Sequence, residues 1–120
     1  MSNIHYSPEA EDDLAKIKKY ISEQLENPIA AQNTVANITK RIRKLELFPE
    51  LGARLSSIIN IASDYRFLVC ANYLAFYRIC ENDVFIVRVL YGRRDYITIL
   101  FGESPQDDTE QERNTEKTEL

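Results

Sequence analysis

A change in the spacing of apolar residues near the middle of the chain limits the folds that this sequence can adopt. Before about residue 47, apolar residues recur at steps of three and four, the spacing of helices with one buried face. After residue 65, short segments rich in Val, Ile, Tyr and Phe are separated by turn residues, which is typical of β-strands. Two helices followed by strands predict an α+β domain with the helices packed on one face of the sheet.

A short strand is expected at residues 2–7, and a helix start follows it. Ser7 suits the N-cap, Pro8 suits the first helical position, and the acidic residues after them suit the positive end of a helix. The apolar residues of this helix share one face, and they are Leu14, Ile17, Ile21 and Leu25. Their spacing predicts an amphipathic helix of about five turns.

Asn27 and Pro28 interrupt the pattern, and a second helix is expected from there to about Leu47. Its apolar stripe consists of Ala31, Val35, Ile38, Ile42 and Leu45. The short connection predicts an antiparallel helical hairpin. The outer face of the second helix carries the bases Lys40, Arg41, Arg43 and Lys44, a run that is typical of a solvated face.

Three strands are expected at residues 65–70, 73–80 and 84–91, and the turn residues between them predict an antiparallel meander. A fourth short strand can follow at residues 96–101, so a meander of three or four strands is expected. Residues 53–64 have no clear period, although their isoleucines can add a short strand or pack under a loop. Because the strands are apolar on both faces, the helices should cover one face and another element should shield part of the other.

The charges divide the chain into a domain at residues 1–102 and a disordered acidic tail at residues 103–120. The tail carries seven acids and two bases, a net −5, whereas the other 102 residues carry 13 bases and 12 acids, a net +1. With almost no apolar residue, the tail cannot bury enough surface to offset the entropy of ordering it. The overall charge of −4 therefore describes the tail, and any basic patch on the domain has to be local.

Several kinds of site and location are not expected. No apolar run reaches the roughly 18 residues that span a bilayer, and no export signal is visible, so we expect a cytoplasmic protein without membrane contact. Cys70 and Cys80 are expected to be reduced and buried or half-buried. With His5 as the single histidine and no paired-cysteine motif, we expect no metal and no small-molecule cofactor.

Several short motifs, in this order, resemble the RelE/ParE toxin superfamily over residues 4–101, and the hairpin is more similar to the ParE branch. The matching segments are residues 6–10 (YSPEA), 27–31 (NPIAA), 47–52 (LFPELG), 73–79 (YLAFYRI) and 87–95 (VRVLYGRRD). The resemblance implies the toxin of a bacterial type II toxin–antitoxin system. Such a toxin inhibits growth and is neutralised by a cognate antitoxin protein.

The resemblance leaves the cellular target open between DNA gyrase and the ribosome. ParE-like toxins block gyrase without being nucleases, whereas RelE-like toxins cleave mRNA on the ribosome. RelE-like nucleases carry a catalytic arginine where this chain has Leu74, and their C-terminal His or Tyr has no clear match. We therefore favour gyrase inhibition without enzymatic activity. A ribosome-dependent endoribonuclease is the alternative, and a non-toxic antitoxin-binding relative is the second alternative.

Arginine grips phosphate and carboxylate through two bonds, so the arginines around the strands are the candidate functional residues. Because Arg66 begins a strand and Arg93 and Arg94 follow one, we expect them to converge at a sheet edge. The expected target-binding residues are Arg66, Arg93, Arg94, Asp95 and Tyr96. If RNA is cleaved, the catalytic candidates are Arg66, Arg94 and Tyr91. The expected antitoxin-binding residues are Leu14, Ile17, Tyr77 and Phe85, under an amphipathic antitoxin segment.

The arginines and tyrosines of the strands can also have purely structural roles. Arg78 and Arg88 can serve the structure, by reaching an edge or by pairing with Asp64 or Asp83. The segment around Arg93 and Arg94 can be a solvated turn with a local pair to Asp95. The tyrosines of the strands, Tyr65, Tyr73 and Tyr77, are expected at the edges of the core.

Overall fold

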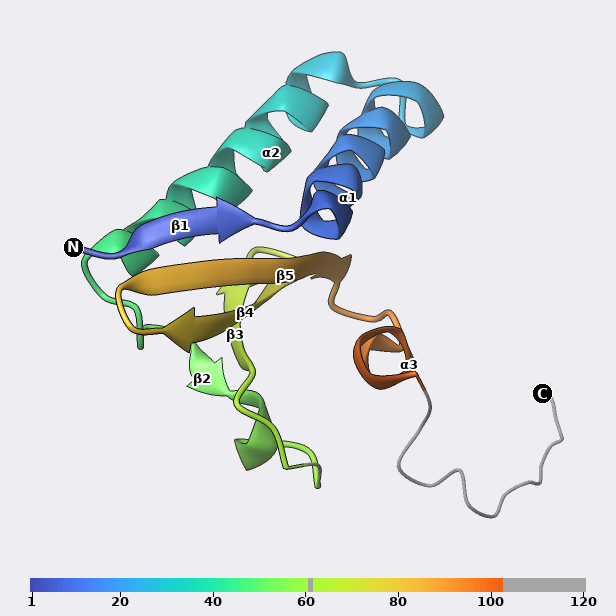
Figure 1. The fold of residues 1–120 in the computed structure, drawn as a ribbon. Coiled ribbons are helices and arrows are strands. Elements are labelled where there is room, and N and C mark those ends of the chain that lie inside the picture. The colour runs from blue at the N-terminus through green and yellow to red at the C-terminus, as the bar shows by residue number, and fades with distance from the viewer. Residues whose placement is uncertain (61, 103–120) are drawn as a thin grey trace, which may run out of the picture.

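The computed structural model describes residues 1–60 and 62–102, and its elements follow the expected order of a strand, two helices and a run of strands (Figure 1). The two long helices lie on one face of a sheet, and a short C-terminal helix lies on the other face. The elements are β1 (Asn3–Tyr6), α1 (Pro8–Lys19), α2 (Pro28–Arg43), β2 (Ala53–Arg54), β3 (Arg66–Cys70), β4 (Tyr73–Cys80), β5 (Asp83–Tyr91) and α3 (Tyr96–Phe101). The predicted α+β class is confirmed.

Short turns of other helix types complete the two long helices. α1 continues into a π-helical turn, Tyr20–Gln24, and α2 continues into a 3-10 turn, Lys44–Glu46. With these turns included, the two helices extend over nearly the same residues as their apolar spacing predicts. The helical hairpin is therefore confirmed.

Side-chain caps explain where the two helices begin. Ser7 Oγ accepts a hydrogen bond from the Ala10 amide at 2.9 Å, and Asn27 Oδ1 accepts one from the Ala30 amide at 3.0 Å. Each cap is followed by a proline, whose missing N–H leaves no helical hydrogen bond unmade at that position. Ser7 Oγ also donates to the Val87 carbonyl of β5 at 2.8 Å, so the start of α1 is tied to the sheet.

The sheet has five strands in the order β1-β5-β4-β3-β2. β3, β4 and β5 form the expected antiparallel meander, and the two-residue β2 pairs antiparallel with β3. β1 pairs with β5 in parallel, with Asn3 level with Asp83. The sheet is therefore mixed, and the first strand of the chain lies at its edge beside the last strand.

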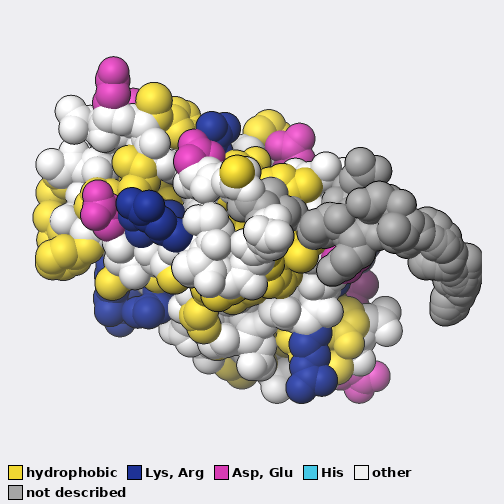
Figure 2. All heavy atoms as spheres, turned by 90° about the horizontal axis from the view of Figure 1, so that it is seen from below, with side chains coloured by type: hydrophobic (Ala, Val, Ile, Leu, Met, Phe, Trp, Pro, Cys, Tyr) yellow, Lys and Arg dark blue, Asp and Glu magenta, His cyan; other side chains and the backbone are white. Residues whose placement is uncertain are grey.

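Apolar side chains form a separate core on each face of the sheet. The upper core, beneath the hairpin, consists of Ala10, Ile38, Ile42, Leu45, Leu68, Cys70, Ala75, Tyr77, Val84, Ile86 and Val89. The lower core contains Leu55, Phe76 and Leu90, and α3 packs on it. The expectation that a second element shields the other face is confirmed. In Figure 2, which shows this lower side, hydrophobic side chains still reach the surface in several places.

The prediction of a fourth meander strand at residues 96–101 is wrong, because this segment forms the helix α3. Asp95 caps it by accepting hydrogen bonds from the Thr98 amide at 3.3 Å and from the Thr98 hydroxyl at 2.8 Å. Gly102 ends it in the left-handed region, with φ at 88°. β-branched residues in the segment favour a strand, but the cap and the apolar lower face of the sheet favour a helix.

The expected disordered tail, residues 103–120, lies outside the described residues. Within residues 1–60 and 62–102, no helix has the length and apolar character needed to cross a membrane. Over the same ranges, no cluster of three or more His, Cys, Asp and Glu side chains is placed to hold a metal ion.

The two cysteines differ in exposure. Cys70 is 3% exposed in the upper core, as expected, whereas Cys80 is exposed, so the prediction that it is at least half-buried is wrong. Cys80 ends β4, where its side chain points away from the upper core. Burial raises the pKa of the Cys70 thiol to about 11.

We expect a thiol reagent at about pH 8 to modify one cysteine in the folded protein and both after denaturation, because Cys70 is shielded and stays protonated. The substitution Cys80→Ser should remove the reaction of the folded protein. Counting modified thiols by absorbance or mass checks this. Rapid labelling of Cys70 in the folded Cys80→Ser variant would contradict it.

Candidate functional site

The turn of residues 92–95, which we call the basic turn, connects β5 to α3. The Arg94 amide donates to the Tyr91 carbonyl at 2.9 Å and so holds the turn closed. Arg93 and Arg94 are exposed, and neither forms an ion pair with a residue in the described part of the chain. A local pair with Asp95 is not formed, because that carboxylate caps α3. Within residues 1–60 and 62–102, no carboxylate engages either guanidinium group.

Tyr73 and Tyr91 lie at the same end of the sheet as the basic turn, and Tyr20 is near Tyr73. Tyr73 meets Tyr91 edge to face, with ring centroids 5.8 Å apart. Burial, and then the nearby hydroxyls of Tyr91 and Tyr20, raises the pKa of Tyr73 above its ordinary value of 10.0. A phenol with a raised pKa is a poor proton acceptor near neutral pH. This end of the sheet therefore offers aromatic and cationic contact groups, and Tyr73 adds no general base to them.

Tyr96 lies between the basic turn and the lower core. Its ring packs on Phe76 with centroids 5.2 Å apart, and the side chain is half-buried. The Tyr96 amide donates to the Arg94 carbonyl at 2.8 Å. Tyr96 thus holds the start of α3 against the sheet. Its half-buried ring supports the basic turn from below and offers a partner little surface.

Arg66 does not join the basic turn, so the prediction that the arginines converge at one edge is wrong. β3 and β5 both run antiparallel to β4, and so they point in the same direction. Arg66 at the start of β3 is level with Tyr77 and Ile86, whereas the basic turn follows Tyr91, five residues further along β5. A rise of roughly 3.4 Å per residue puts about 17 Å between the two levels. Because the Arg66 guanidinium is also bonded to the Gly52 carbonyl, Arg66 and Arg94 do not form one site.

Arg66 instead holds residues 47–52, which we call the clamped loop. Its Nη1 donates to the Gly52 carbonyl at 2.8 Å. Tyr77 completes the clamp, because its hydroxyl donates to the Pro49 carbonyl at 2.8 Å and accepts from the Gly52 amide at 2.9 Å. Two strands of the sheet thus fix the loop that follows α2.

Tyr77 itself is completely buried, and burial raises its pKa. It is the largest of the fully buried side chains of the described residues, and it fills the upper core rather than its edge. The expectation that it contacts an antitoxin does not fit this position, because it offers no surface to a partner. Its role in the structure is to hold the clamped loop.

The other three expected antitoxin contacts differ in position. Leu14 packs against the upper core and also lines a groove of about 440 Å³ between α1, α2 and β1. Ile17 is half-buried against the same core. Phe85 is 41% exposed and stacks on His5, with centroids 5.0 Å apart. Because side chains alternate along β5 and both neighbours of Phe85 lie in the upper core, Phe85 points to the opposite face from Leu14.

The two central arginines have structural partners. Arg78 grips Asp64 through bonds of 2.9 and 3.1 Å, which confirms one of its expected pairs, and it holds the pKa of Asp64 below its usual value. Arg88 pairs with Asp13 of α1 at 2.7 and 2.8 Å, a partner that was not predicted. The sequence does contain a signal for this face, because Asp13 precedes Ile17 of the predicted apolar stripe by four residues and so lies on the inner face of α1.

Leu74, the position where RelE-like nucleases carry a catalytic arginine, packs against the lower core with Phe76 and Leu90. The side chains of α3 pack on the same cluster. This half-buried position therefore belongs to the apolar packing on the lower face of the sheet.

The sequence matches the family model described as the ParE toxin of the type II toxin–antitoxin system parDE, over residues 4–96. The chain belongs to the ParE toxin family. Among solved structures, it is similar to a chain of the chromosomal ParDE toxin–antitoxin system from P. aeruginosa, with a TM-score of 0.64 and 22% sequence identity over 76% of this chain and 96% of that chain. None of the curated protein sequences compared with it matches.

The family match confirms the predicted superfamily and its ParE branch, and the structural likeness shows the shared fold. The match ends at Tyr96, the first residue of α3. It therefore includes the hairpin, the clamped loop and the basic turn, and almost all of α3 lies beyond it.

Proposed function

We propose that this ParE family toxin inhibits growth by binding DNA gyrase, and that a cognate antitoxin neutralises it. Its family supports the role of a type II toxin with an antitoxin partner. The family does not specify the target, and the proposal of gyrase depends on the residues of the candidate site.

One observation carries the choice, namely the surroundings of Leu74. Cleavage of RNA needs a cation beside the reacting phosphate and a pair of groups that move protons. At the position of β4 where RelE-like nucleases carry a catalytic arginine, this chain has Leu74, which packs against the lower core. Arg66 lies about 17 Å along the strand direction from the end of β5, and it binds the Gly52 carbonyl. Inhibition by binding needs none of these catalytic groups.

The basic turn is the proposed contact with the target. Arg93 and Arg94 project from it without an ion-pair partner among the described residues, and Tyr91 beside them is 43% exposed. Arginine and tyrosine are the residue types that most often dominate the energetics of protein interfaces. Asp95 and Tyr96 support this surface by capping and packing α3.

We expect the purified protein to inhibit the supercoiling of relaxed plasmid by gyrase at micromolar concentration. Replacing both Arg93 and Arg94 by alanine should raise the concentration for half inhibition by roughly tenfold or more, because two exposed contact groups are lost. The variant Lys16→Ala is a matched control, since Lys16 is also exposed but pairs with Asp12 on α1.

Three results would each contradict a part of this proposal. Full supercoiling activity at saturating toxin would remove gyrase as the target. New mRNA ends on translating ribosomes, lost in the Arg94→Ala variant, would establish RNA cleavage in its place. Equal inhibition by the double variant and the wild type would leave gyrase as the target but exclude the basic turn as the surface that contacts it.

A further inference from the structure

The negative charge of the C-terminal tail is concentrated in its first eight residues. Residues 103–110, which we call the acidic segment, contain Glu103, Asp107, Asp108 and Glu110 and no base, a net −4. Residues 111–120 contain three acids and two bases, a net −1 before the terminal carboxylate is counted. Four carboxylates without a neighbouring base are suited to pair with exposed guanidinium groups.

The acidic segment begins close to the basic turn, because only α3 and Gly102 separate the two in the chain (Figure 1). α3 has six residues, and a helix of that length is about 9 Å long. Gly102 ends it, so the helix extends no further from the basic turn. Five residues of extended chain reach about 17 Å from Gly102. The adjacent aspartates of the acidic segment can therefore lie against the two arginines of the basic turn while the domain keeps its fold.

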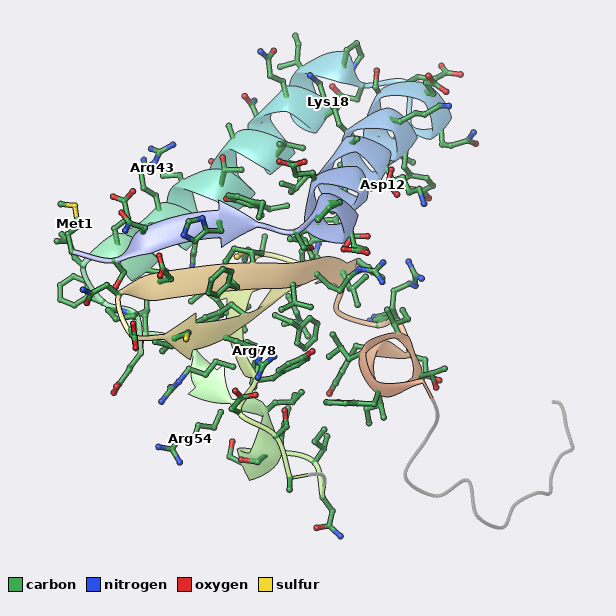
Figure 3. The ribbon with its side chains drawn as sticks, in the orientation of Figure 1. Met1, Asp12, Lys18, Arg43, Arg54 and Arg78 are labelled. Atoms are coloured by element: carbon green, nitrogen blue, oxygen red, sulfur yellow. The ribbon has the colours of Figure 1, made fainter. Side chains whose placement is uncertain are left out.

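Other exposed bases that form no ion pair within residues 1–60 and 62–102 lie elsewhere on the molecule. In Figure 3, Lys18 lies towards the tip of the hairpin, and Arg43 and Arg54 lie at the end that carries Met1. The hairpin also lies on the opposite face of the sheet from α3. The basic turn is therefore the pair of exposed guanidinium groups that the acidic segment meets first.

The acids of the domain near this end have other partners. Asp95, the acid of the basic turn itself, caps α3 through both of its carboxylate oxygens. The acids of α1 act on Arg88. Asp13 pairs with it, and the charges of Glu9 and Asp12 add to that attraction and raise the pKa of the guanidinium further. In the part of the chain that the structure describes, no carboxylate thus competes for the arginines of the basic turn.

We propose that the acidic segment binds the basic turn of its own chain and competes there with the target. The competition rests on the function proposed above, whereas the contact does not. Because the segment is tethered beside the turn, it acts at an effective concentration of roughly millimolar, and pairs that are individually weak are enough to hold it. A target that binds the turn more tightly displaces the segment, so the tail lowers the apparent affinity of the toxin without blocking it.

Paramagnetic broadening of NMR signals tests the contact in the full chain. A nitroxide is attached at Thr109→Cys in the Cys80→Ser background, because Cys70 is buried and its thiol stays protonated. The label should broaden the amide signals of residues 92–95. The same label at Thr118→Cys, outside the acidic segment, should broaden them less.

Charge changes distinguish binding from mere proximity of the label. Replacing Arg93 and Arg94 by glutamine should reduce the broadening from the label at position 109 by about twofold or more. Raising the salt to about 0.5 M should do the same, because exposed charges are then screened. Arg54→Gln is the matched control, since Arg54 is an exposed arginine without an ion pair among the described residues, and it should leave the broadening unchanged.

Gyrase supercoiling tests the competition. The first variant changes the four acids of the acidic segment to their amides, and it should reach half inhibition at a concentration about threefold lower than the wild type does. The control variant changes the three acids of residues 111–120 to their amides and should inhibit like the wild type. Neither variant alters residues 1–102. The substitutions are Glu103→Gln, Asp107→Asn, Asp108→Asn and Glu110→Gln in the first variant, and Glu112→Gln, Glu116→Gln and Glu119→Gln in the control.

Two NMR results would overturn the contact. One is equal broadening with and without the arginines of the basic turn. The other is the same broadening in a mixture of labelled chains and unlabelled isotope-enriched chains, which would place the contact between two molecules. Equal half inhibition by the two tail variants would overturn the competition. If the wild type leaves gyrase unaffected, the proposed function fails, and the broadening still decides whether the acidic segment binds the basic turn.

Discussion

Replacing Asp13 by alanine is expected to lower the free energy of unfolding by about 3 kcal/mol. The Asp13 carboxylate is buried, it accepts bonds of 2.7 and 2.8 Å from the Arg88 guanidinium, and it accepts a bond of 2.9 Å from the Val89 amide. Alanine would leave a partly buried cation and a buried N–H group without a partner. In a domain of this size the melting temperature should fall by roughly 10 °C or more.

Asp12→Ala is the matched control for this substitution. Asp12 is the preceding residue on α1 and forms an ion pair of 2.9 Å with Lys16, but both side chains are mostly exposed. Its loss should change stability by less than about 0.5 kcal/mol. Urea unfolding followed by circular dichroism compares the two variants. Equal midpoints for Asp12→Ala and Asp13→Ala would show that the buried pair does not tie α1 to β5.

Gly52→Ala is expected to have a similar or larger effect, about 3 kcal/mol. An added Cβ would lie 2.5 Å from the Phe67 carbonyl oxygen and 2.7 Å from the Tyr77 hydroxyl. Since neither atom can move without disturbing β3 or the upper core, the clamped loop should shift. That shift would break the bond that the Tyr77 hydroxyl donates to the Pro49 carbonyl and the bond that it accepts from the Gly52 amide.

Gly92→Ala provides the comparison. Its added Cβ would have the Asn72 carbonyl oxygen at 3.3 Å as its nearest neighbour, so we expect a loss of under about 1 kcal/mol. Thermal melts of the two variants measure the difference. Equal stability of the two glycine variants would contradict the steric account.

The parts of the fold that depend on local chemistry were predicted from the sequence. Ser7 was predicted to cap the first helix, and its oxygen does reach the amide three residues ahead. The start of the second helix at Asn27 and Pro28 was also predicted, and the structure adds that Asn27 caps it. The three meander strands follow from apolar segments with turn residues between them. The exposed arginines of the basic turn were found in the same way, from their place just after a strand.

The parts that depend on contacts between distant segments were not predicted. The distance between Arg66 and the basic turn follows from the direction in which β3 runs beside β4, and the residues at the strand ends do not specify where their side chains reach. The pair of Asp13 with Arg88 joins residues 75 positions apart. The sequence predicts a strand where α3 forms, because six apolar and β-branched residues are too few to show a helical period.

The parallel pairing of β1 with β5 has a consequence for the order in which the protein folds. Ser7 at the end of β1 bonds to Val87, 80 residues later in the chain. At a synthesis rate of roughly 5–20 residues per second, the first strand waits about 4–16 s for its partner to be made. During that time the hairpin has no sheet to cover its apolar face, and the sheet closes only after nearly the whole domain has left the ribosome. A partner that meets the chain during synthesis would therefore encounter the hairpin before the finished toxin exists.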